Sequence, residues 1–391
     1  MRRRQIIMIS RAIQVELGKS IRQFPVVTVT GTRQCGKTTL LKHALPEYQY
    51  VSLEDPDIRE LAMEDPRAFL SDYDDHVIID EAQRVPQLFS YIQTKIDSRD
   101  ETGQYILSGS HNFLLMESIS QSLAGRCAVL KMAPFSIGEL KDAGLLPESV
   151  WKQMLVGGYP RLYDKKIEPA DYFPSYVMTY IERDVRSVRR ITDSAQFSLF
   201  VRLCAARVGQ VLNMAALANE TGISVPTANA WLSILEQSYV IYRLHPYYRN
   251  YSKRLIKSPK LYFYDTGLLC YFLGIETEEQ LKRSDHSGAV FEDLIVTEYL
   301  KQQFILGREP AAWFWRDTNQ NEVDLLTERG ADLHAYEIKL SETMNRKFLK
   351  GLEHFSNLAG IPASHLTCLY RGKDYMTSKG AFANYQGYVF P

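Results

Sequence analysis

The sequence predicts an α/β protein that begins with a parallel β-sheet covered by helices on both faces. Three observations lead to this prediction. Apolar runs alternate with helix-like stretches over residues 26–135, which is typical of a parallel sheet. Residues 211–242 are typical of two helices joined by a glycine-containing turn and followed by a strand. After about residue 275, a helix, strand-like runs at WFWRD, EVDLL and HAYEIKL, and a helix-rich tail predict a second α/β domain.

Three apolar runs form the predicted core of the first sheet. VVTVT over residues 26–30 stops at Gly31, HVIID ends at Asp80, and YILSGS ends near Ser110. CAVLKMAPF continues the alternation of strands and helices, and residues 137–205 are predicted to be mainly helical. The predicted domains are therefore a sheet domain, a helical lid or linker, a winged helix-turn-helix with a basic wing, and a nuclease-like α/β domain, over residues 1–140, 141–195, 196–272 and 273–391.

The composition is that of an ordinary globular protein. Of 391 residues, 45% are apolar and 24% charged, which excludes a disordered or collagen-like chain. The 46 basic residues balance the 46 acidic ones, so only local clusters can predict a partner. The five cysteines are scattered and form no CxxC pair, which indicates reduced thiols in a cytoplasmic protein. No apolar run approaches the roughly 18 residues of a membrane helix, so no membrane partner is expected.

A nucleotide-binding loop is predicted where the first strand ends. GTRQCGKT over residues 31–38 fits G-x-x-x-x-G-K-[ST], follows a strand and begins a helix, the setting in which backbone N–H groups surround phosphate oxygens. Lys37 would reach the β- and γ-phosphates, and Thr38 would ligate Mg²⁺. The alternative is a glycine-rich turn with a chance lysine. The predicted nucleotide-binding residues are Gly31, Thr32, Arg33, Gln34, Cys35, Gly36, Lys37, Thr38 and Thr39.

Two carboxylates follow the second strand, in HVIIDEAQ. They lie at the carboxyl end of a strand, where α/β sheets bind ligands. Asp80 is predicted to hold Mg²⁺ and Glu81 to polarise the water that attacks the γ-phosphate. The alternative is a pair of solvated loop acids. The third strand ends in Ser108, Gly109 and Ser110, where a hydroxyl would sense the γ-phosphate or orient water, and Ser110 is the predicted site residue. A Ser-Gly-Ser turn is also a common loop.

Arg126 lies between a helix-like segment and the next strand. An arginine in that place can project from the edge of the domain, and its predicted role is that of an arginine finger given to the nucleotide of a neighbouring subunit. Hydrolysis would then depend on assembly. The alternative is a surface arginine with a solvated head.

The helix-turn-helix over residues 211–242 precedes a basic stretch. No acidic residue lies between Glu236 and Asp265, and seven tyrosines are interleaved with six basic residues. Because basic side chains neutralise phosphates and aromatic rings stack on exposed bases, this stretch predicts contact with nucleic acid. The alternative is a helical packing unit whose basic residues pair with acids elsewhere. The predicted DNA contacts are Arg243, Arg249, Lys253, Arg254, Lys257 and Lys260.

A group of acidic residues and one lysine near the C-terminus is typical of PD-(D/E)xK nucleases. NEVDLL places Asp324 in a strand, and AYEIKL places Glu337 and Lys339 on the same side of the next. Glu292 on the preceding helix is the fourth member. Asp324 and Glu337 are predicted to hold Mg²⁺, while Lys339 would position or activate water. The alternative is a simple ion pair in a degenerate nuclease fold used for docking or assembly.

The motifs together resemble those of a family. GTRQCGKTTLL, VIIDEAQ, YILSGS, SLAGR, APFSIGEL and GGYP, with YIERDV and KSPKLYFYDTGLL, are similar to the bacterial and archaeal AAA+ ATPases that carry an uncharacterised C-terminal domain. The resemblance implies a P-loop AAA+ parallel sheet with a helical lid. It also implies ATP rather than GTP as the nucleotide, a homo-oligomer such as a ring, and the roles given above for Lys37, Asp80, Glu81 and Arg126. The absence of an NKxD motif agrees with ATP.

The function expected from the sequence is an oligomeric, Mg²⁺-dependent ATP hydrolase that acts on duplex or branched DNA. Two other functions remain open. The first is a nucleotide-controlled switch that binds a protein partner, with the C-terminal fold as the platform. The second is a restriction-like nuclease that ATP gates.

Overall fold

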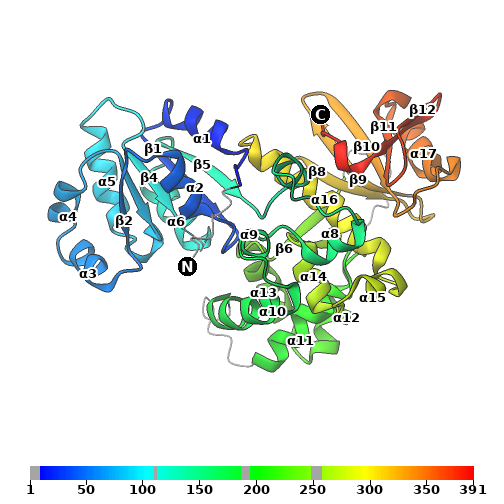
Figure 1. Ribbon diagram of the computed structural model, residues 1–391, viewed down its shortest axis with the longest axis horizontal. Helices are drawn as coiled ribbons and strands as arrows, with labels where there is room; N and C mark the ends of the chain where they lie inside the picture. The colour runs from blue at the N-terminus through cyan, green and yellow to red at the C-terminus, as the bar shows by residue number, and fades with distance from the viewer. Residues whose placement is uncertain (1–8, 110–111, 186–193, 248–257) are drawn as a thin grey trace, which may run out of the picture. The chain divides into compact units, whose positions relative to one another are not determined.

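The computed structural model describes residues 9–109, 112–185, 194–247 and 258–391 (Figure 1). The chain divides into two compact units. The first consists of Met1–Phe135 with Gln237–Tyr239 and Gln303–Glu309, and the second contains the rest of the chain. The finer division predicted at residues 195 and 272 stays a prediction.

A five-stranded parallel sheet forms the centre of the first unit and confirms the predicted α/β class. Its strands, in spatial order, are β2 (Gln49–Ser52), β3 (Val77–Asp80), β4 (Tyr105–Ser108), β1 (Val26–Gly31) and β5 (Cys127–Met132). Strand β2 was not predicted, because QYVS is a short edge strand in which only Val51 is buried. In register, Asp80 pairs with Ser108 and Gly31 pairs with Met132, so the carboxyl ends of these strands share one edge.

Helices cover both faces of this sheet because successive strand residues point to opposite sides. Val27 and Val29 of β1 pack in one apolar core with α1 and α2. Val26 packs in the other core with α4, α5 and α6. The helical elements of the first unit are α1 (Gln14–Ile21), α2 (Lys37–Ala44), α3 (Pro56–Glu64), α4 (Pro66–Asp72), η1 (Ala82–Arg84), α5 (Leu88–Asp97) and α6 (Asn112–Ser122).

The second unit begins with helices, as the sequence predicts for residues 137–205. A capping box formed by Ser136 and Glu139 starts the first of them. These elements are α7 (Ile137–Asp142), α8 (Val150–Val156), α9 (Pro160–Asp164), α10 (Pro169–Tyr176), the π-helix η2 (Val177–Val185) and α11 (Ser194–Ala205). Three further helices of this unit are α14 (Thr266–Phe272), α15 (Glu278–Arg283) and α16 (Ser287–Ile305).

The predicted helix-turn-helix is present as a pair of helices and a turn. Helix α12 (Met214–Thr221) ends at Gly222, whose φ of 75° suits a glycine, and α13 (Val225–Gln237) follows. Strand β6 (Ile241–Pro246) then pairs antiparallel with β7 (Lys260–Phe263). This is the chain order of a winged helix, and DNA binding by it stays a prediction.

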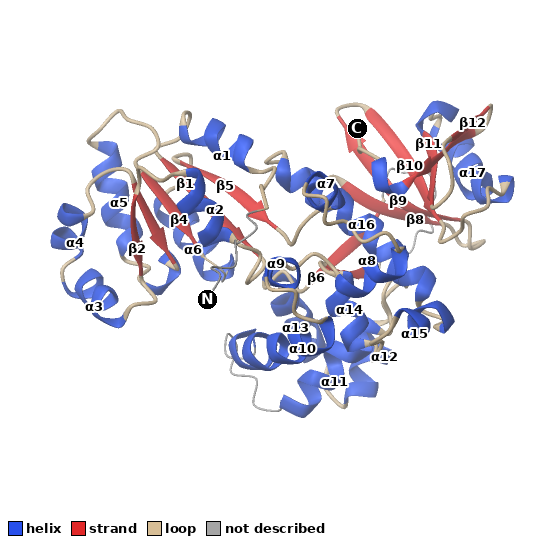
Figure 2. Ribbon diagram, viewed as in Figure 1, coloured by secondary structure: helices blue, strands red, loops and turns tan. Residues whose placement is uncertain are grey.

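An eight-stranded mixed sheet completes the second unit (Figure 2). Its strands, in spatial order, are β12 (Tyr375–Thr377), β13 (Gly380–Asn384), β11 (Leu366–Tyr370), β10 (Asp332–Ile338), β9 (Glu322–Arg329), β8 (Ala312–Arg316), β6 and β7. Helix α17 (Lys350–Ala359) contacts β9, β10 and β11. Short 3-10 helices lie at η3 (Arg346–Leu349), η4 (Ala363–His365) and η5 (Tyr385–Gly387).

The C-terminal region differs in part from its prediction. The helix before it and the strands at WFWRD, EVDLL and HAYEIKL are confirmed as α16, β8, β9 and β10. The predicted helix-rich tail is wrong, because it contributes three strands and only one α-helix. LTCLY at β11 is a short, fully buried run, and such a run does not distinguish a strand from a helix by periodicity.

Candidate functional site: a phosphate-binding loop and its carboxylates

The loop after β1 has the backbone conformation that a phosphate-binding loop requires. Gly31 has a φ of 136°, and a Cβ there would overlap with the carbonyl oxygen of Met132. Gln34 and Gly36 also have positive φ values, 61° and 94°. Because left-handed residues turn successive N–H groups toward one side of a loop, this backbone suits an anion at the start of α2.

Lys37 lies inside the loop, as the sequence predicts for a lysine that reaches phosphate. Its side chain is buried, and its Nζ donates to the carbonyl oxygens of Gly31 at 3.1 Å and Thr32 at 2.9 Å. Thr32 Oγ1 is also buried and has no hydrogen-bond partner among the described residues. The loop therefore contains an ammonium group and a hydroxyl that a phosphate group could engage.

The other predicted loop residues are arranged around this centre. Arg33 is half-buried, Gln34 and Thr39 are exposed, and Cys35 is fully buried in the core beneath the loop. One residue that holds the loop, Arg11, was not predicted from the sequence. Arg11, before α1, donates from Nη1 to the Cys35 carbonyl at 2.6 Å and from Nη2 to the Ala133 carbonyl at 2.8 Å. No motif marks Arg11, because its partners are backbone atoms far away in the sequence.

Thr38 and Asp80 meet at the carboxyl edge of the sheet. Thr38 Oγ1 donates to Asp80 Oδ2 at 2.9 Å, and Tyr50 OH donates to the same oxygen at 2.8 Å. Ser108 donates from Oγ to the other oxygen of Asp80. A threonine hydroxyl and a carboxylate are the oxygen ligands that Mg²⁺ prefers, so these two residues could hold the predicted ion.

Tyr50 is a neighbour of Asp80 that sequence reasoning did not identify, whereas Ser108 belongs to the Ser-Gly-Ser segment that was predicted to provide a hydroxyl. Burial raises the pKa of the Tyr50 phenol above its usual value, and the charge of Asp80 raises it further. The Lys42 ammonium lies 3.5 Å from the centre of the Tyr50 ring. No sequence signal marked Tyr50, which is the second residue of the unpredicted strand β2.

Glu81 follows Asp80 in a left-handed backbone conformation, with φ 54° and ψ 42°. This conformation is uncommon for a residue other than glycine and occurs often at functional sites. The carboxylate of Glu81 accepts a hydrogen bond from Nε2 of Gln83. The third predicted member of the site, Ser110, lies outside the described residues.

Arg126 lies at the amino-terminal ends of the strands, whereas the phosphate-binding loop lies at their carboxyl ends. It precedes β5, and β5 runs parallel to β1 with Cys127 opposite Val26. Strand β1 has six residues, so roughly 17 Å separates this edge from the phosphate-binding loop. The guanidinium of Arg126 pairs with Asp97 through Nε at 2.5 Å and Nη2 at 2.9 Å. Arg126 therefore does not serve the loop of its own chain.

The predicted nuclease residues come together in the second unit. Lys339 Nζ lies 2.6 Å from Glu337 Oε1 and 3.6 Å from Asp324 Oδ2. Burial raises the pKa of Glu337 to about 8, and the charge of Asp324 contributes to this rise. Burial also raises the pKa of Glu292, while Lys260 lowers it and Asp324 raises it again. The four residues therefore share one electrostatic environment.

Lys260 corrects the predicted DNA surface. Its side chain is only 1% exposed, and its Nζ lies 3.1 Å from Glu292 Oε1 and 2.5 Å from Glu322 Oε1. Tyr262, two residues further along β7, donates its OH to Glu292 Oε1 at 2.6 Å. The prediction that Lys260 contacts DNA is wrong, because its ammonium points into the carboxylate cluster and away from solvent.

The remaining predicted DNA contacts are only partly visible. Arg243 on β6 is half-buried and donates from Nε to Glu236 Oε2 at 2.8 Å. The sequence window that showed no acidic residue begins immediately after this glutamate. The other four predicted contacts lie outside the described residues, and they are Arg249, Lys253, Arg254 and Lys257.

The described residues provide little support for a metal ion at the second cluster. Within residues 9–109, 112–185, 194–247 and 258–391, no three His, Cys, Asp or Glu side chains are arranged to hold one. The ion predicted at Asp324 and Glu337 therefore stays a prediction. The Lys339 ammonium contacts both of these carboxylates, and the Lys260 ammonium contacts Glu292 and Glu322. Within the same ranges, no helix has the length and apolar character needed to cross a membrane.

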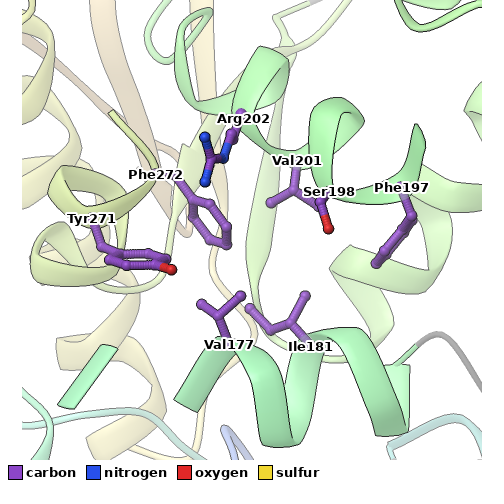
Figure 3. Close-up of a pocket in the computed structure, with 8 residues that line it drawn as sticks. All are labelled: Val177, Ile181, Phe197, Ser198, Val201, Arg202, Tyr271 and Phe272. Atoms are coloured by element: carbon purple, nitrogen blue, oxygen red, sulfur yellow. The ribbon is translucent and has the colours of Figure 1, made fainter. Parts of the chain in front are cut away.

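A cavity in the second unit lies between η2, α11 and α14 (Figure 3). Its volume is about 30 Å³, which is room for about one or two water molecules. Figure 3 shows Val177 and Ile181 on one side and Arg202 and Phe272 on the other. The cavity is too small for a nucleotide.

Three sequence profiles match the chain. The profile described as an AAA domain matches residues 23–141, and two described as domains of unknown function, DUF8612 and DUF4143, match residues 147–279 and 287–385. Among solved structures, the Walker-type ATPase PABY2304 of Pyrococcus abyssi is 16% identical, with a TM-score of 0.46 over 68% of this chain and 96% of that one. That likeness is too distant to support an argument about function.

Two curated relatives are more similar. The uncharacterized protein Rv2008c of Mycobacterium tuberculosis and the uncharacterized protein Mb2031c of Mycobacterium bovis are each 30% identical over 338 residues. The match covers 85% of this chain and 74% of each relative. The profile described as an AAA domain matches residues 23–141, and the chain belongs to the family of these two mycobacterial proteins.

Proposed function

We propose that the protein is a Mg²⁺-dependent ATP hydrolase. The observation that carries the proposal is the 2.9 Å hydrogen bond from Thr38 Oγ1 to Asp80 Oδ2. It joins the first turn of α2 to the end of β3 beside a loop whose backbone suits phosphate. Glu81 is the next residue after Asp80, so a second carboxylate lies within reach of the same place. The AAA domain match supports the same reaction class.

Each side chain of the site has a separate role in the proposed hydrolysis. Lys37 and the N–H groups of the loop would bind the β- and γ-phosphates, and Thr38 and Asp80 would hold Mg²⁺. The ion, when bound, neutralises charge on the phosphate oxygens. Glu81 accepts a proton from the attacking water, whose oxygen bonds to the γ-phosphorus while the bond to the β–γ bridging oxygen breaks. The products are ADP and inorganic phosphate.

A lysine substitution tests this site. Lys37→Ala removes the ammonium group inside the loop and should abolish phosphate release from ATP. The matched control is Lys19→Ala, because Lys19 is exposed on α1 and pairs with Glu16 of the same helix. Wild-type turnover in Lys37→Ala, or wild-type turnover that persists in excess EDTA, would refute the proposed hydrolase.

We propose further that hydrolysis requires a second copy of the chain. Arg126 lies at the edge of the sheet opposite its own loop and is exposed. A trans arginine finger needs such a position, since it must reach a neighbour rather than its own nucleotide. The Asp97 ion pair would have to open when Arg126 engages a neighbour's γ-phosphate.

We propose DNA, duplex or branched, as the macromolecule on which the ATPase acts. The support is the order of elements: α12, a turn, α13 and then the antiparallel pair β6 and β7. The test is a panel of duplex and branched DNA added to the ATPase assay. Stimulation that falls steeply with salt supports DNA, because neutralised phosphates release counterions. No stimulation by any DNA would refute it.

A second candidate is a nucleotide-controlled switch that binds a protein partner. The observation that favours it is the carboxylate cluster, where Lys260 and Lys339 pair with Glu292 and Glu337. The buried Lys260 ammonium offsets the charge of these carboxylates, which weakens their attraction for a metal ion. Cleavage of labelled DNA with Mg²⁺ or Mn²⁺, lost in Asp324→Ala, would instead establish a nuclease.

A further inference from the structure

The segment after Glu81 contains a buried amide that the proposed hydrolysis has not used. Gln83 lies in η1, and its side chain is 5% exposed. Its Nε2 donates to Glu81 Oε2. Its Oε1 is buried and accepts no hydrogen bond from the described residues. A buried carbonyl oxygen without a donor destabilises the folded chain, so a partner for this atom is expected.

The carboxylate of Glu81 decides which way the amide of Gln83 points. An amide rotated by half a turn would place its carbonyl oxygen against Glu81, where two acceptors repel each other. The NH₂ group therefore faces Glu81, and Oε1 must face away from it. Any partner of Oε1 has to be a hydrogen-bond donor.

The free end of the amide lies against the end of β4. A Cβ at Gly109 would overlap with Gln83 Oε1, so no residue larger than glycine fits there without moving the amide. Gly109 N donates to the Val29 carbonyl at 3.4 Å, which joins the end of β4 to the strand that carries the phosphate-binding loop. Gln83 thus contacts the proposed base with one end of its amide and lies against Gly109, beside the strand of the loop, with the other.

We propose that Gln83 is a positioning residue for ATP hydrolysis. Its Nε2 holds the Glu81 carboxylate in place, and its Oε1 accepts a hydrogen bond from the attacking water. The water then donates one hydrogen to Gln83 and its other proton to Glu81, so its remaining lone pair faces the γ-phosphate. This inference rests on the proposed hydrolase activity and adds a residue that the motif DEAQ contains but that sequence reasoning did not use.

Gln83→Ala tests the role through a split between rate and affinity. It removes both ends of the amide, and kcat should fall about 10²-fold, the loss that follows from misplacing a reacting group by about 1 Å. The affinity for ATP, measured by fluorescence of a labelled ATP analogue, should stay within about twofold, because Gln83 touches no proposed phosphate ligand. The matched control is Gln87→Ala, since Gln87 is exposed in the same segment and should leave kcat unchanged.

Gly109→Ala provides a second, independent test. The added methyl group displaces Oε1 without removing the amide, and kcat should again fall at least tenfold with ATP affinity retained. Wild-type kcat in both Gln83→Ala and Gly109→Ala overturns the inference, as does an equal loss of rate and affinity. If wild-type protein binds ATP but never releases phosphate, the proposed hydrolase fails first, and that result is read from the wild type alone.

Discussion

Removal of the Lys260 ammonium should destabilise the second unit strongly. Lys260 Nζ lies 3.1 Å from Glu292 and 2.5 Å from Glu322, with the lysine 1% exposed. At an effective dielectric constant of about 20, each attraction is about 5 to 7 kcal/mol, and desolvation of the charges offsets most of it. Loss of one partner of a buried pair leaves the other uncompensated, so Lys260→Met should lower the free energy of unfolding by about 3–5 kcal/mol.

The loss of unfolding free energy caused by Lys260→Met should grow as the pH rises from 5 to 9. The pKa of Lys260 is raised above its usual value: burial lowers it, but the charges of Glu292, Asp324 and Glu322 together outweigh burial. The stability that Lys260 contributes is therefore fully present over this range and is lost only in strong alkali. In Lys260→Met the opposing effect of the ammonium on Glu292 is gone, so Glu292 takes up a proton more readily. As the pH rises, Glu292 of the folded variant must ionise without the ammonium beside it, so the free energy of unfolding of Lys260→Met falls.

Urea unfolding followed by tryptophan fluorescence measures this difference. Trp315 on β8 is buried in the core of the same sheet and reports its opening. The control is Lys282→Met, because Lys282 is exposed on α15 and should change stability by no more than about 0.5 kcal/mol. A loss below about 1 kcal/mol in Lys260→Met, or a loss that shrinks with rising pH, would refute the reasoning.

The remaining predictions concern the other cluster members and the loop. Glu337 has a folded-state pKa of about 8 against an ordinary 4.5, so its contribution to stability is present below about pH 4.5 and is lost as the pH rises through 8. That decline in the free energy of unfolding is at most about 1.4 kcal/mol per pH unit. Glu337→Gln should make it shallower in urea titrations across this pH range, and an unchanged slope would contradict this prediction. Mixing Arg126→Ala with Glu81→Gln subunits should restore some ATPase activity, and no recovery at any ratio counts against a trans finger. Gly31→Ala should abolish binding of a labelled ATP analogue, since its Cβ overlaps with Met132, and wild-type affinity would show that the loop tolerates a side chain.

Much of the nucleotide site could be predicted because its signals are local. The strand before Gly31, the glycine spacing and the helix after Lys37 all lie in one short stretch of sequence, and the structure has that order. The meeting of Thr38 with Asp80 follows from a general rule, since carboxyl ends of parallel strands share an edge. Tyr50 was missed, and Ser108 was not linked to Asp80, because no local pattern shows which strands lie beside β3.

The C-terminal cluster was predicted only in part. Asp324, Glu337 and Lys339 were found from strand alternation, and the structure brings them together with Glu292. The misassigned residue is Lys260, which looked like one member of a basic surface. Its partners lie 32 and 62 residues away in the sequence, and only strand pairing reveals that β7 turns this side chain inward.

The sequence by itself determined the alternation of strands and helices, the phosphate-binding loop and the acids that follow β3. Each of these depends on backbone preferences and side-chain spacing within a few neighbouring residues. Only the tertiary structure decided that Gln83 bridges Glu81 and the end of β4, that Arg126 pairs with Asp97, and that Lys260 neutralises buried carboxylates. The physical reason is that burial and electrostatic pairing depend on which distant segments pack together, and a linear pattern does not contain that information.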